Sequence, residues 1–569
     1  MFRCSPNSTN REAERYLKTS LLSPFSVGFV IGDLKSKEVK DQDSLTYVRI
    51  WADEAVVNQM DFACDTTLKI FRFYQSFFRS IHNANKIDLA ALPNYGRADK
   101  WMYGLMTTDE SSIAIQDSSS RIKKINVAFH LCDLFCHQYF GPQTTLSTWS
   151  ENWINMGFAL FFRIPCIEAI FLNNNPSIVN INLVESFIRI LAVEAEIKSR
   201  PVMLPDKRIN LITLFEDSML AETAYLLVRM MNFFLGQNTL LEGVKNYIRN
   251  FRFKVTNLNN LWTLFPLEKE KHEILKIDST LEDIMDSWTS KAGYAHIKLT
   301  RVTDSNMMKI EQVLPLAVNE EVNGYRIIPL NFVTKSELIA DSNPKAAVKL
   351  WLKVEYDSRS LDLLKKTLLD VVEFKLIPAL TRTNFIFDLF ALAETKENYY
   401  SVVFETMQYL RHENSPLPFI VALHELNKIR VGLFGTEVFP LFQNYVREIL
   451  QPIFSGKLFS NIAELPQDDY ETYHFKKLIT IASCTFGLEN CVGQAERLFD
   501  VWSSKKQPKI DNPIPEILRP NIYCRIIQTN FRDEVWDFFW SLYEKDNPNN
   551  FDDILSALAC TEDENKLKE

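Results

Sequence analysis

Glycine and proline are scarce, with 15 and 23 residues among 569, and no tract of biased composition interrupts the chain. Long disordered linkers are therefore not expected. No run of about eighteen apolar residues occurs, which argues against a membrane span. The first twenty residues, MFRCSPNSTNREAERYLKTS, lack the apolar core that a signal peptide needs.

Basic stripes and the common nucleotide and hydrolase motifs are missing as well. The net charge is −9 and Lys and Arg are not gathered in one place, so no nucleic-acid partner is expected. The chain has no G-x-G-x-x-G, G-x-x-x-x-G-K-[ST] or G-x-S-x-G sequence. These absences argue against the dinucleotide-binding, P-loop and serine-hydrolase classes.

Apolar patterning divides the chain into strand-like and helical stretches. A chain of 569 residues exceeds a single hydrophobic core, which predicts about three to four domains. Segments rich in β-branched and aromatic residues predict strands at 21–34, 45–51, 297–302, 324–333 and 347–356. Helical spacing dominates from about 58 to 291 and returns from Leu361 almost to the C-terminus, where it is typical of a helical solenoid.

One segment, residues 127–162, carries a recognisable pattern. Its sequence is VAFHLCDLFCHQYFGPQTTLSTWSENWINMGFALFF. The second half resembles the core of the aminopeptidase N family of zinc peptidases, H-E-x-x-H-Q-W-F-G followed by a Trp-rich helix that ends N-E-G-F-A. The matching residues are His137, Gln138, Tyr139, Phe140, Gly141, Trp149, Trp153, Asn155, Gly157, Phe158 and Ala159. The register holds at both ends without a gap, so chance is a poor explanation.

Flanking segments extend the resemblance over about residues 20–565. Residues 92–110, LPNYGRADKWMYGLMTTDE, resemble the family's substrate-edge strand, in which G-A-M-E-N precedes W-G-L-I-T. Residues 285–294 resemble the end of the catalytic domain, and 482–491 and 514–560 resemble the C-terminal helical domain. The chain is identified as a member of this family.

The resemblance implies a multidomain α+β fold: a thermolysin-like α/β catalytic-type domain, a small β-sandwich and a C-terminal α-helical superhelical domain. The domains we predict are a remnant of an N-terminal β domain at 1–38, a peptidase-type domain at 39–292, the β-sandwich at 293–379 and an incomplete helical domain at 380–569. Full-length surface members carry a membrane span and a large β domain before these parts. We therefore expect a truncated form of a longer membrane-anchored protein.

The family's metal and base positions are changed. Its pattern holds zinc with two His one turn apart and a Glu on the next helix, and a Glu beside the first His is the general base. Here Asp133 and Met156 take two of the ligand positions, His137 keeps the third, and Leu134 takes the place of the base. A carboxylate is an acceptable zinc ligand, whereas a thioether suits copper(I) far better. Leucine cannot accept a proton.

The substrate side of the pattern is changed too. In the run Ala98–Met102, Trp101 takes the place of the carboxylate that would pair with a free peptide amine. Ala221 falls where the family has the tyrosine that stabilises the oxyanion, and Tyr225 follows one turn later.

From these changes we expect a non-peptidase homologue without zinc, which acts as a binding, adhesion or scaffold protein, with cell migration as one setting. The alternative is a divergent or residual zinc metalloaminopeptidase acting on peptide N-termini, using Asp133, His137 and a further ligand. The expected partner is a peptide or protein, with a homodimer through the helical domain as a further expectation. Membrane contact is expected only through segments absent from this chain.

Two groups of residues leave alternatives open. One alternative is a new metal site formed by His130, Cys132, Cys136 and His137. The other is that the two cysteines fill small-residue positions of a buried helix. Trp101 and Tyr103 either bind a partner that lies along the edge strand, or Trp101 fills the pocket and partners bind the helical domain.

Four further cysteines resemble the two disulfides of animal cell-surface members, Cys484–Cys491 and Cys524–Cys560. Disulfides persist mainly in oxidising compartments, so the resemblance implies the cell surface, the extracellular space or the secretory lumen. The sequon Asn7-Ser8-Thr9 is compatible with that location. Four unpaired cytosolic thiols are the alternative.

Overall fold

The structure, a computed structural model, groups the chain into two compact units. Unit 1 comprises 1–175, 189–295 and 314–331, and unit 2 comprises 176–188, 296–313 and 332–569. The residues that the structure describes are 2–4, 13–15, 18–40, 46–79, 86–93, 95, 99–115, 121–172, 176–196, 201–203, 218–266, 279–302, 307–313, 325–330, 352–396, 399–454, 470–508, 511–529, 533–544, 551–561, 563 and 566.

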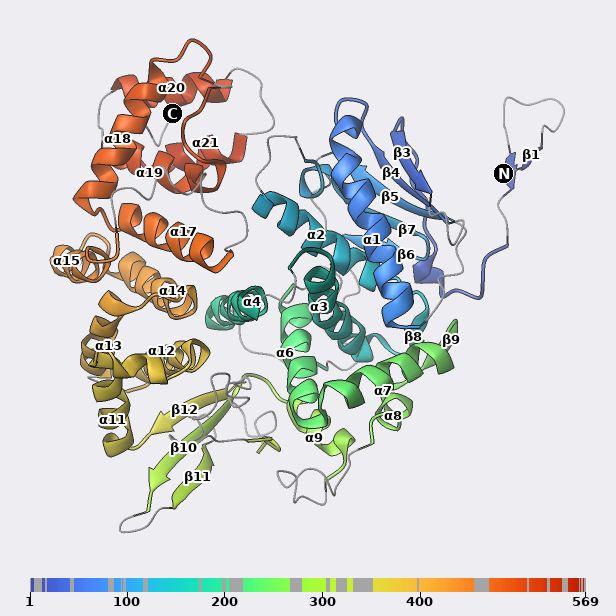
Figure 1. The fold of residues 1–569 in the computed structure, drawn as a ribbon, viewed down its shortest axis with the longest axis horizontal. Coiled ribbons are helices and arrows are strands. Elements are labelled where there is room, and N and C mark those ends of the chain that lie inside the picture. Colours follow the sequence, from blue (N-terminus) through green and yellow to red (C-terminus); the bar gives the residue numbers. More distant parts are fainter. Residues whose placement is uncertain are drawn as a thin grey trace. The chain divides into compact units, whose positions relative to one another are not determined.

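Unit 1 combines a five-stranded sheet with packed helices (Figure 1). Its strands are β1 (Phe2–Cys4), β2 (Ala13–Arg15), β3 (Lys35–Lys40), β4 (Tyr47–Ala52), β5 (Lys86–Leu92), β6 (Lys100–Met102), β7 (Leu105–Asp109), β8 (Thr144–Leu146) and β9 (Lys254–Thr256). Its helices and helical turns are η1 (Pro24–Ser26), η2 (Val57–Met60), α1 (Asp61–Phe77), η3 (Glu110–Ser112), α2 (Arg121–Cys136), η4 (Trp149–Glu151), α3 (Trp153–Ile167), the π turn η5 (Glu168–Leu172), α6 (Ser218–Leu235), α7 (Gln237–Asn250), α8 (Leu258–Trp262) and α9 (Leu281–Thr289).

The main sheet runs in the order β3-β4-β5-β7-β6. Strands β4, β5 and β7 are parallel, and the edge strands β3 and β6 are antiparallel to their neighbours. Residues 87–91 of β5 are all buried, as expected for a central strand of a parallel sheet with both faces covered. The short strand β6 therefore lies at one edge of the sheet, where a further strand can pair with it.

Helix α3 passes through the core of unit 1 against α2 and α6. Twelve of its fifteen residues are buried. A Cβ atom placed at Gly157 would lie 2.7 Å from the backbone oxygen of Ala224 on α6, so only glycine permits this approach. The helical run Trp149–Phe171 is the one described segment that is long and apolar enough to cross a membrane, but 61% of its window is buried inside the protein, as in a core helix.

The sequence predicts some elements of unit 1 and misses others. The strand at 45–51 is confirmed by β4, and the helical stretch from 58 begins with η2 and α1. The strand at 21–34 is wrong, because this segment contains only the turn η1 and exposes Leu21, Phe29 and Ile31. Its β-type composition has no neighbouring strand among the described residues.

Unit 2 is a small sheet followed by a helical array. Its strands are β10 (Ala295–Arg301, whose first residue is counted with unit 1), β11 (Met308–Val313) and β12 (Leu352–Tyr356), in the order β11-β10-β12. Its helices are α11 (Ser358–Leu369), η7 (Glu373–Leu376), α12 (Ala379–Ala393), α13 (Tyr399–Met407), η8 (Gln408–His412), α14 (Pro416–Leu433), α15 (Phe439–Leu450), α17 (Tyr470–Thr485), α18 (Glu489–Ser503), η9 (Glu516–Leu518), α19 (Arg519–Thr529), α20 (Asp533–Glu544) and α21 (Phe551–Leu558).

The predicted strand at 297–302 is confirmed by β10, and the end of 347–356 by β12. Residues 325–330 of the predicted strand 324–333 have no strand, and its other residues lie outside the described part of the chain.

Helix α4 (Pro176–Glu196) belongs to both units, because 176–188 cluster with unit 2 and the rest with unit 1. In unit 2 the Ser177 hydroxyl donates to the Glu471 carboxylate at 2.5 Å, and the ring centroids of Phe187 and Phe387 lie 4.8 Å apart. The first half of α4 is thus packed on helices that follow it by some two hundred residues or more in the sequence.

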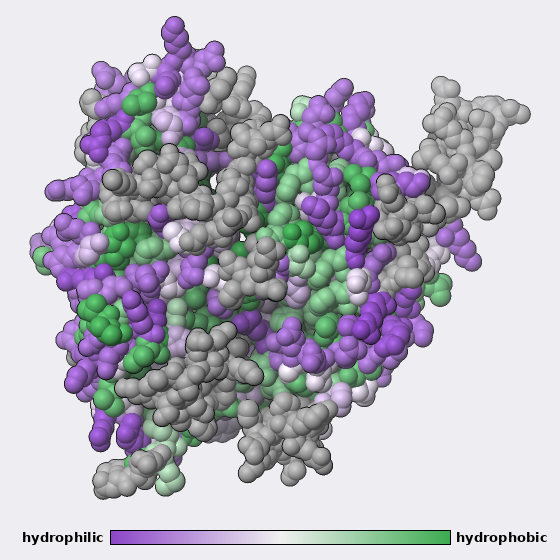
Figure 2. Space-filling view, viewed as in Figure 1, coloured by the Kyte–Doolittle hydropathy of each residue, from purple (hydrophilic) through white to green (hydrophobic). Residues whose placement is uncertain are grey.

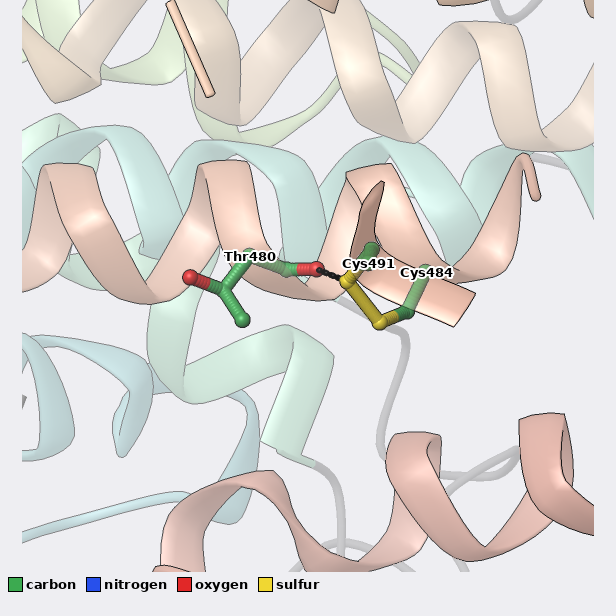
Figure 3. The surroundings of a disulfide bond; sticks show 3 residues. All are labelled: Thr480, Cys484 and Cys491. Carbon is green, nitrogen blue, oxygen red and sulfur yellow. Dashed lines mark hydrogen bonds between the residues drawn. A yellow bond between two sulfur atoms is a disulfide. The ribbon is translucent and has the colours of Figure 1, made fainter. Parts of the chain in front are cut away.

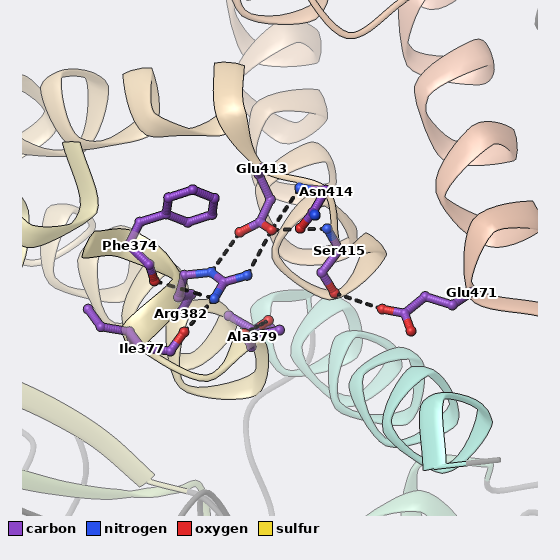
Figure 4. Close-up of polar contacts among 9 residues, drawn as sticks. Phe374, Ile377, Ala379, Arg382, Glu413, Asn414, Ser415 and Glu471 are labelled. Carbon is purple, nitrogen blue, oxygen red and sulfur yellow. Dashed lines mark hydrogen bonds and ion pairs between the residues drawn. The ribbon is translucent and has the colours of Figure 1, made fainter. Parts of the chain in front are cut away.

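A buried ion pair joins α12 to the turn before α14 (Figure 4). Arg382 donates from Nε and Nη2 to the two oxygens of Glu413 at 2.7 and 2.8 Å, and the side chains are 6% and 0% exposed. Glu413 also accepts the backbone N–H groups of Asn414 and Ser415. Both charged groups are therefore buried and hydrogen-bonded, and the pair links α12 to the turn before α14.

Both predicted disulfides are present in unit 2. Cys484–Cys491 closes the turn between α17 and α18, and the Cys491 sulfur lies 3.6 Å from the Thr480 carbonyl oxygen (Figure 3). Cys524–Cys560 joins α19 to the end of α21. The described surface of the helical array is mainly hydrophilic on the face in Figure 2, with small separate hydrophobic patches.

The predicted fold class is confirmed: the protein is a multidomain α+β protein with a helical C-terminal part. The domain boundaries at 38, 292 and 379 stay predictions.

Candidate active site

A polar pair, half-buried Asp133 and buried His137, lies at the end of helix α2. His137 lies one turn after Asp133, and its backbone N–H donates to the Asp133 carbonyl. The His137 Nε2 is 3.9 Å from Asp133 Oδ1, an oxygen that is buried and has no hydrogen-bond partner among the residues that the structure describes. Burial lowers the pKa of His137, although the Asp133 carboxylate opposes this shift. The structure thus brings together two of the predicted site residues as a neutral imidazole and a carboxylate.

Leu134 and the cysteines of α2 point into packed surroundings. Leu134 is 1% exposed, and Cys132 and Cys136 are fully buried. This agrees with the packing alternative for the two cysteines. No group of three His, Cys, Asp or Glu side chains arranged to hold a metal occurs within the described ranges.

Helix α3 supplies the position of the third ligand. Met156 lies there and is 4% exposed. Its neighbour Asn155 donates to the Thr144 carbonyl and accepts from the Tyr247 hydroxyl, while Gly157 packs against α6. These contacts fix the helix around Met156, whose thioether is a poor zinc ligand.

The position predicted for the oxyanion tyrosine lies on α6. Ala221 is half-buried there and has no donor group. Tyr225, one turn later, is fully buried, and its hydroxyl lacks a hydrogen-bond partner within the described residues. An unpaired hydroxyl in a core is costly, which makes Tyr225 the residue of α6 to test.

Trp101 of the edge strand β6 lies over the histidine. The ring centroids of Trp101 and His137 are 3.8 Å apart with an interplanar angle of 12°. Gly141 has φ +115° and would place a Cβ 3.7 Å from the indole nitrogen. The indole therefore covers the face of the imidazole and leaves its edge, where Nε2 lies, toward Asp133.

Gln138 fastens strand β6 to the end of α2, a role that the sequence motif did not reveal. Its side chain donates to the Met102 carbonyl at 3.0 Å and accepts the Gly104 N–H at 2.8 Å. Tyr103 lies between these two residues and packs edge-on against Phe253, with ring centroids 5.3 Å apart. Phe253 has φ +55°, a conformation rare for a side chain of this size.

A second carboxylate near Asp133 was also missed. Asp99 Oδ2 lies 3.5 Å from His130 Nε2, and that nitrogen is 2.7 Å from the Thr108 hydroxyl. Burial raises the pKa of Asp99; His130 and Thr108 oppose the shift, while Asp133 adds to it. The signal in the sequence was an aspartate beside the edge strand and a histidine one turn before Asp133. Ala98 lies outside the described residues, as does the sequon at 7–9.

Comparison with known proteins identifies the class. Residues 62–288 match the peptidase family M1 domain, and 351–569 match the ERAP1-like C-terminal domain. The chain is 25% identical to aminopeptidase N of Bos taurus over 97% of its own length and 60% of that protein. It is 24% identical to aminopeptidase N of Homo sapiens over 98% of the chain and 60% of the relative, and 24% identical to aminopeptidase Ey of Gallus gallus over 95% and 58%. The chain spans about 60% of these relatives.

The fold and the matches define a metallopeptidase-type protein. The chain belongs to the aminopeptidase N family.

Two predictions are corrected by these matches. The M1 peptidase domain and the aminopeptidase N relatives point to a peptidase, so the prediction of a non-enzyme is wrong. Aminopeptidases of this family are zinc enzymes, so the prediction that zinc is lost is wrong as well. The physical reason is that a change of ligand type does not abolish a site: within the described structure, Asp133 Oδ1 is a buried carboxylate oxygen that accepts no hydrogen bond and lies beside His137.

Proposed function

We propose that this chain is a divergent zinc metalloaminopeptidase that acts slowly on peptide N-termini. The observation that supports this most directly is the pair of Asp133 and His137, in which a buried carboxylate oxygen that accepts no hydrogen bond from the described residues lies 3.9 Å from His137 Nε2. Two ligands about 2.0–2.1 Å from a tetrahedral zinc lie roughly 3.3 Å apart, so a small side-chain rotation suffices.

The donor set fits zinc at two positions and not at the third. Asp133 and His137 would hold the ion, whereas the Met156 thioether does not suit zinc. A site with two protein donors is expected to bind zinc more weakly than a site with three. When bound, zinc polarises a peptide carbonyl and activates water.

The chain's own groups set the orientation and the rate. Strand β6 offers an edge along which a peptide can pair, and Gln138 holds that edge beside His137. Leu134 stands in the place of a general base and cannot accept a proton. Absence of such a base typically slows a reaction about 100- to 10,000-fold, which is why we expect slow turnover.

A second candidate function is binding of a peptide or surface protein at the same edge. The stack of Trp101 on His137 favours it, because interfacial tryptophans are common anchors of bound partners. The two disulfides support a cell-surface, extracellular or secretory location for either function.

Zinc titration tests the main proposal. Calorimetry of the full chain should give one zinc per chain, and aminoacyl reporter amides should be cleaved slowly in a zinc-dependent manner. Substitution His137→Ala should abolish both signals, whereas His412→Ala, at an exposed histidine of unit 2, should leave both unchanged. Zinc binding that survives His137→Ala, or no binding in excess zinc, would contradict the proposal.

Substitution Tyr225→Phe separates a role in turnover from a role in packing. Removing a buried hydroxyl that has no hydrogen-bond partner among the described residues should leave stability unchanged or slightly higher. If Tyr225 donates to a reacting peptide, turnover should fall while zinc affinity stays the same. Equal turnover in the variant would show that α6 supplies no donor through Tyr225.

A further inference from the structure

Two arginines from different helices meet over the turn that joins α17 to α18. The turn contains Gly487, whose φ of +73° lies in the left-handed region that favours glycine. A Cβ atom at this position would lie 2.7 Å from Nη2 of Arg525 on α19 and 2.9 Å from Nη2 of Arg447 on α15. The missing side chain of Gly487 therefore leaves the space into which both guanidinium groups reach.

The two positive groups are close neighbours. Since both terminal nitrogens lie within 2.9 Å of one point, they are no more than about 6 Å apart. Like charges at this separation repel each other, and the repulsion is stronger for half-buried side chains such as these than it is in bulk water. An anion that contacts both groups would remove this repulsion.

Arg447 is held in place while part of its guanidinium group keeps its donors available. Its Nε donates to the Phe486 carbonyl at 2.8 Å, and its Nη1 donates to the side-chain oxygen of Asn444 at 3.1 Å. Both acceptors are neutral, and no carboxylate of the described residues forms an ion pair with Arg447. The carboxylate of the next residue, Glu448, pairs with Arg411 at 2.9 Å instead. The positive charge of Arg447 is thus not neutralised within the described structure.

We propose that Arg447 and Arg525 form a binding site for a tetrahedral oxyanion, namely sulfate or phosphate. A guanidinium group presents paired N–H donors to an oxyanion, and two such groups from different helices can bind different oxygens of a tetrahedral ion. Both side chains are half-buried, so a small ion reaches them from solvent. The disulfide Cys484–Cys491 spans the turn, and Arg447 is fastened to the turn by its bond to Phe486, so little ordering is needed on binding.

The oxyanion has two sources with the same chemistry. It is either a free ion or a sulfate or phosphate group carried by a larger molecule, such as a sulfated sugar. The site lies entirely in unit 2 and requires neither zinc nor a peptide at the candidate active site of unit 1. Its test is therefore independent of the proposed aminopeptidase activity.

Calorimetric titration of the full chain with sodium sulfate tests the site, and sodium phosphate is the second probe. Sodium chloride keeps the ionic strength constant, so that general screening does not change during the titration. We expect one sulfate per chain, and an unfolding midpoint that rises with sulfate concentration as the measured affinity requires. A sulfated disaccharide that competes with sulfate would show that the site accepts a carried group, and one that does not bind would restrict the site to the free ion.

Variants assign the binding to the two arginines. Arg447→Gln and Arg525→Gln should each weaken the affinity for sulfate at least tenfold, whereas Arg359→Gln, at an exposed arginine of α11, should leave it unchanged. Because Arg447 also fastens the turn, Arg447→Lys provides a version that keeps the positive charge and should retain part of the affinity. Equal sulfate affinity in the wild type and in a folded Arg447→Gln or Arg525→Gln variant would overturn the proposal. A response to sulfate no larger than the response to chloride would overturn it as well.

Discussion

The contact of α3 with α6 predicts that Gly157→Ala destabilises unit 1. The added Cβ would lie 2.7 Å from the Ala224 carbonyl oxygen, 2.9 Å from its carbonyl carbon and 2.9 Å from Val228 Cγ2. Two of these atoms are backbone, so no side-chain rotation relieves the contact and the helices must move apart. Overpacking of this kind costs about 1–3 kcal/mol, and we place this site at the upper end because the backbone cannot yield.

Intrinsic helix propensity works in the opposite direction. Alanine is favoured over glycine inside a helix by about 0.8–1 kcal/mol. The net expectation for Gly157→Ala is therefore a loss of about 2 kcal/mol, or about 4–8 °C in the unfolding midpoint of a unit of this size. Thermal unfolding followed by hydrogen exchange in peptides of α3 and α6 assigns the loss to unit 1.

The matched control is Gly493→Ala in α18. Gly493 lies inside a helix as Gly157 does, but beyond its own helix backbone no atom of the described structure lies within 4 Å of its added Cβ. The same substitution should therefore stabilise α18 by about 0.5–1 kcal/mol. A Gly157→Ala variant whose α3 peptides exchange no faster than wild type would show that the α3–α6 contact is not as close as the structure has it.

Three further substitutions test other parts of the chain. Arg382→Met should lower the free energy of unfolding by about 3–5 kcal/mol, because it leaves the fully buried Glu413 carboxylate without its cation. In urea unfolding, the double variant Arg382→Met, Glu413→Leu should recover much of that loss. Losses that simply add in the double variant would contradict this account. Burial, together with the charge of Lys477, lowers the pKa of His474 to about 3. Below about pH 6.5 the unfolded chain therefore binds a proton at this histidine that the folded chain does not bind, and the free energy of unfolding should fall by a few kcal/mol as the pH drops from 6.5 toward 3. The variant His474→Asn should reduce this dependence of stability on pH. Phe253→Gly relieves the positive φ but removes the ring that packs on Tyr103, so we expect unchanged stability together with a change in peptide affinity, read by titration of a peptide against both proteins.

The sequence predicted the parts of the site that lie on regular helices. Asp133 and His137 were expected one turn apart because four residues make a turn of helix, and the structure places them together. The packing alternative for Cys132 and Cys136 followed from the same periodicity. The disulfides Cys484–Cys491 and Cys524–Cys560 came from the family resemblance, since spacing alone cannot choose a pairing.

Contacts between distant segments were beyond the sequence. Neither the contact of Gln138 with β6 nor the approach of Asp99 to His130 has a periodic signal, because each joins segments more than thirty residues apart in the sequence. The segment 21–34 was misread because β-branched and aromatic residues favour strands only where a neighbouring strand is available. The replaced ligand positions were overinterpreted, because residue type was weighed without the geometry that places a buried oxygen of Asp133 beside His137.

The dual membership of helix α4 has a consequence for how the chain is made. Phe187 leaves the ribosome two hundred residues before Phe387, the ring it packs against. At about 5–20 residues per second that interval lasts roughly 10–40 s. During that time the apolar face of α4 is exposed, because its partner has not yet been synthesised. The nascent chain therefore presents an apolar surface that a chaperone can bind and that is buried in the finished protein. A fragment of unit 2 that starts after α4 would lack the helix segment 176–188, which packs in the core of that unit. Such a fragment would separate residues that fold together.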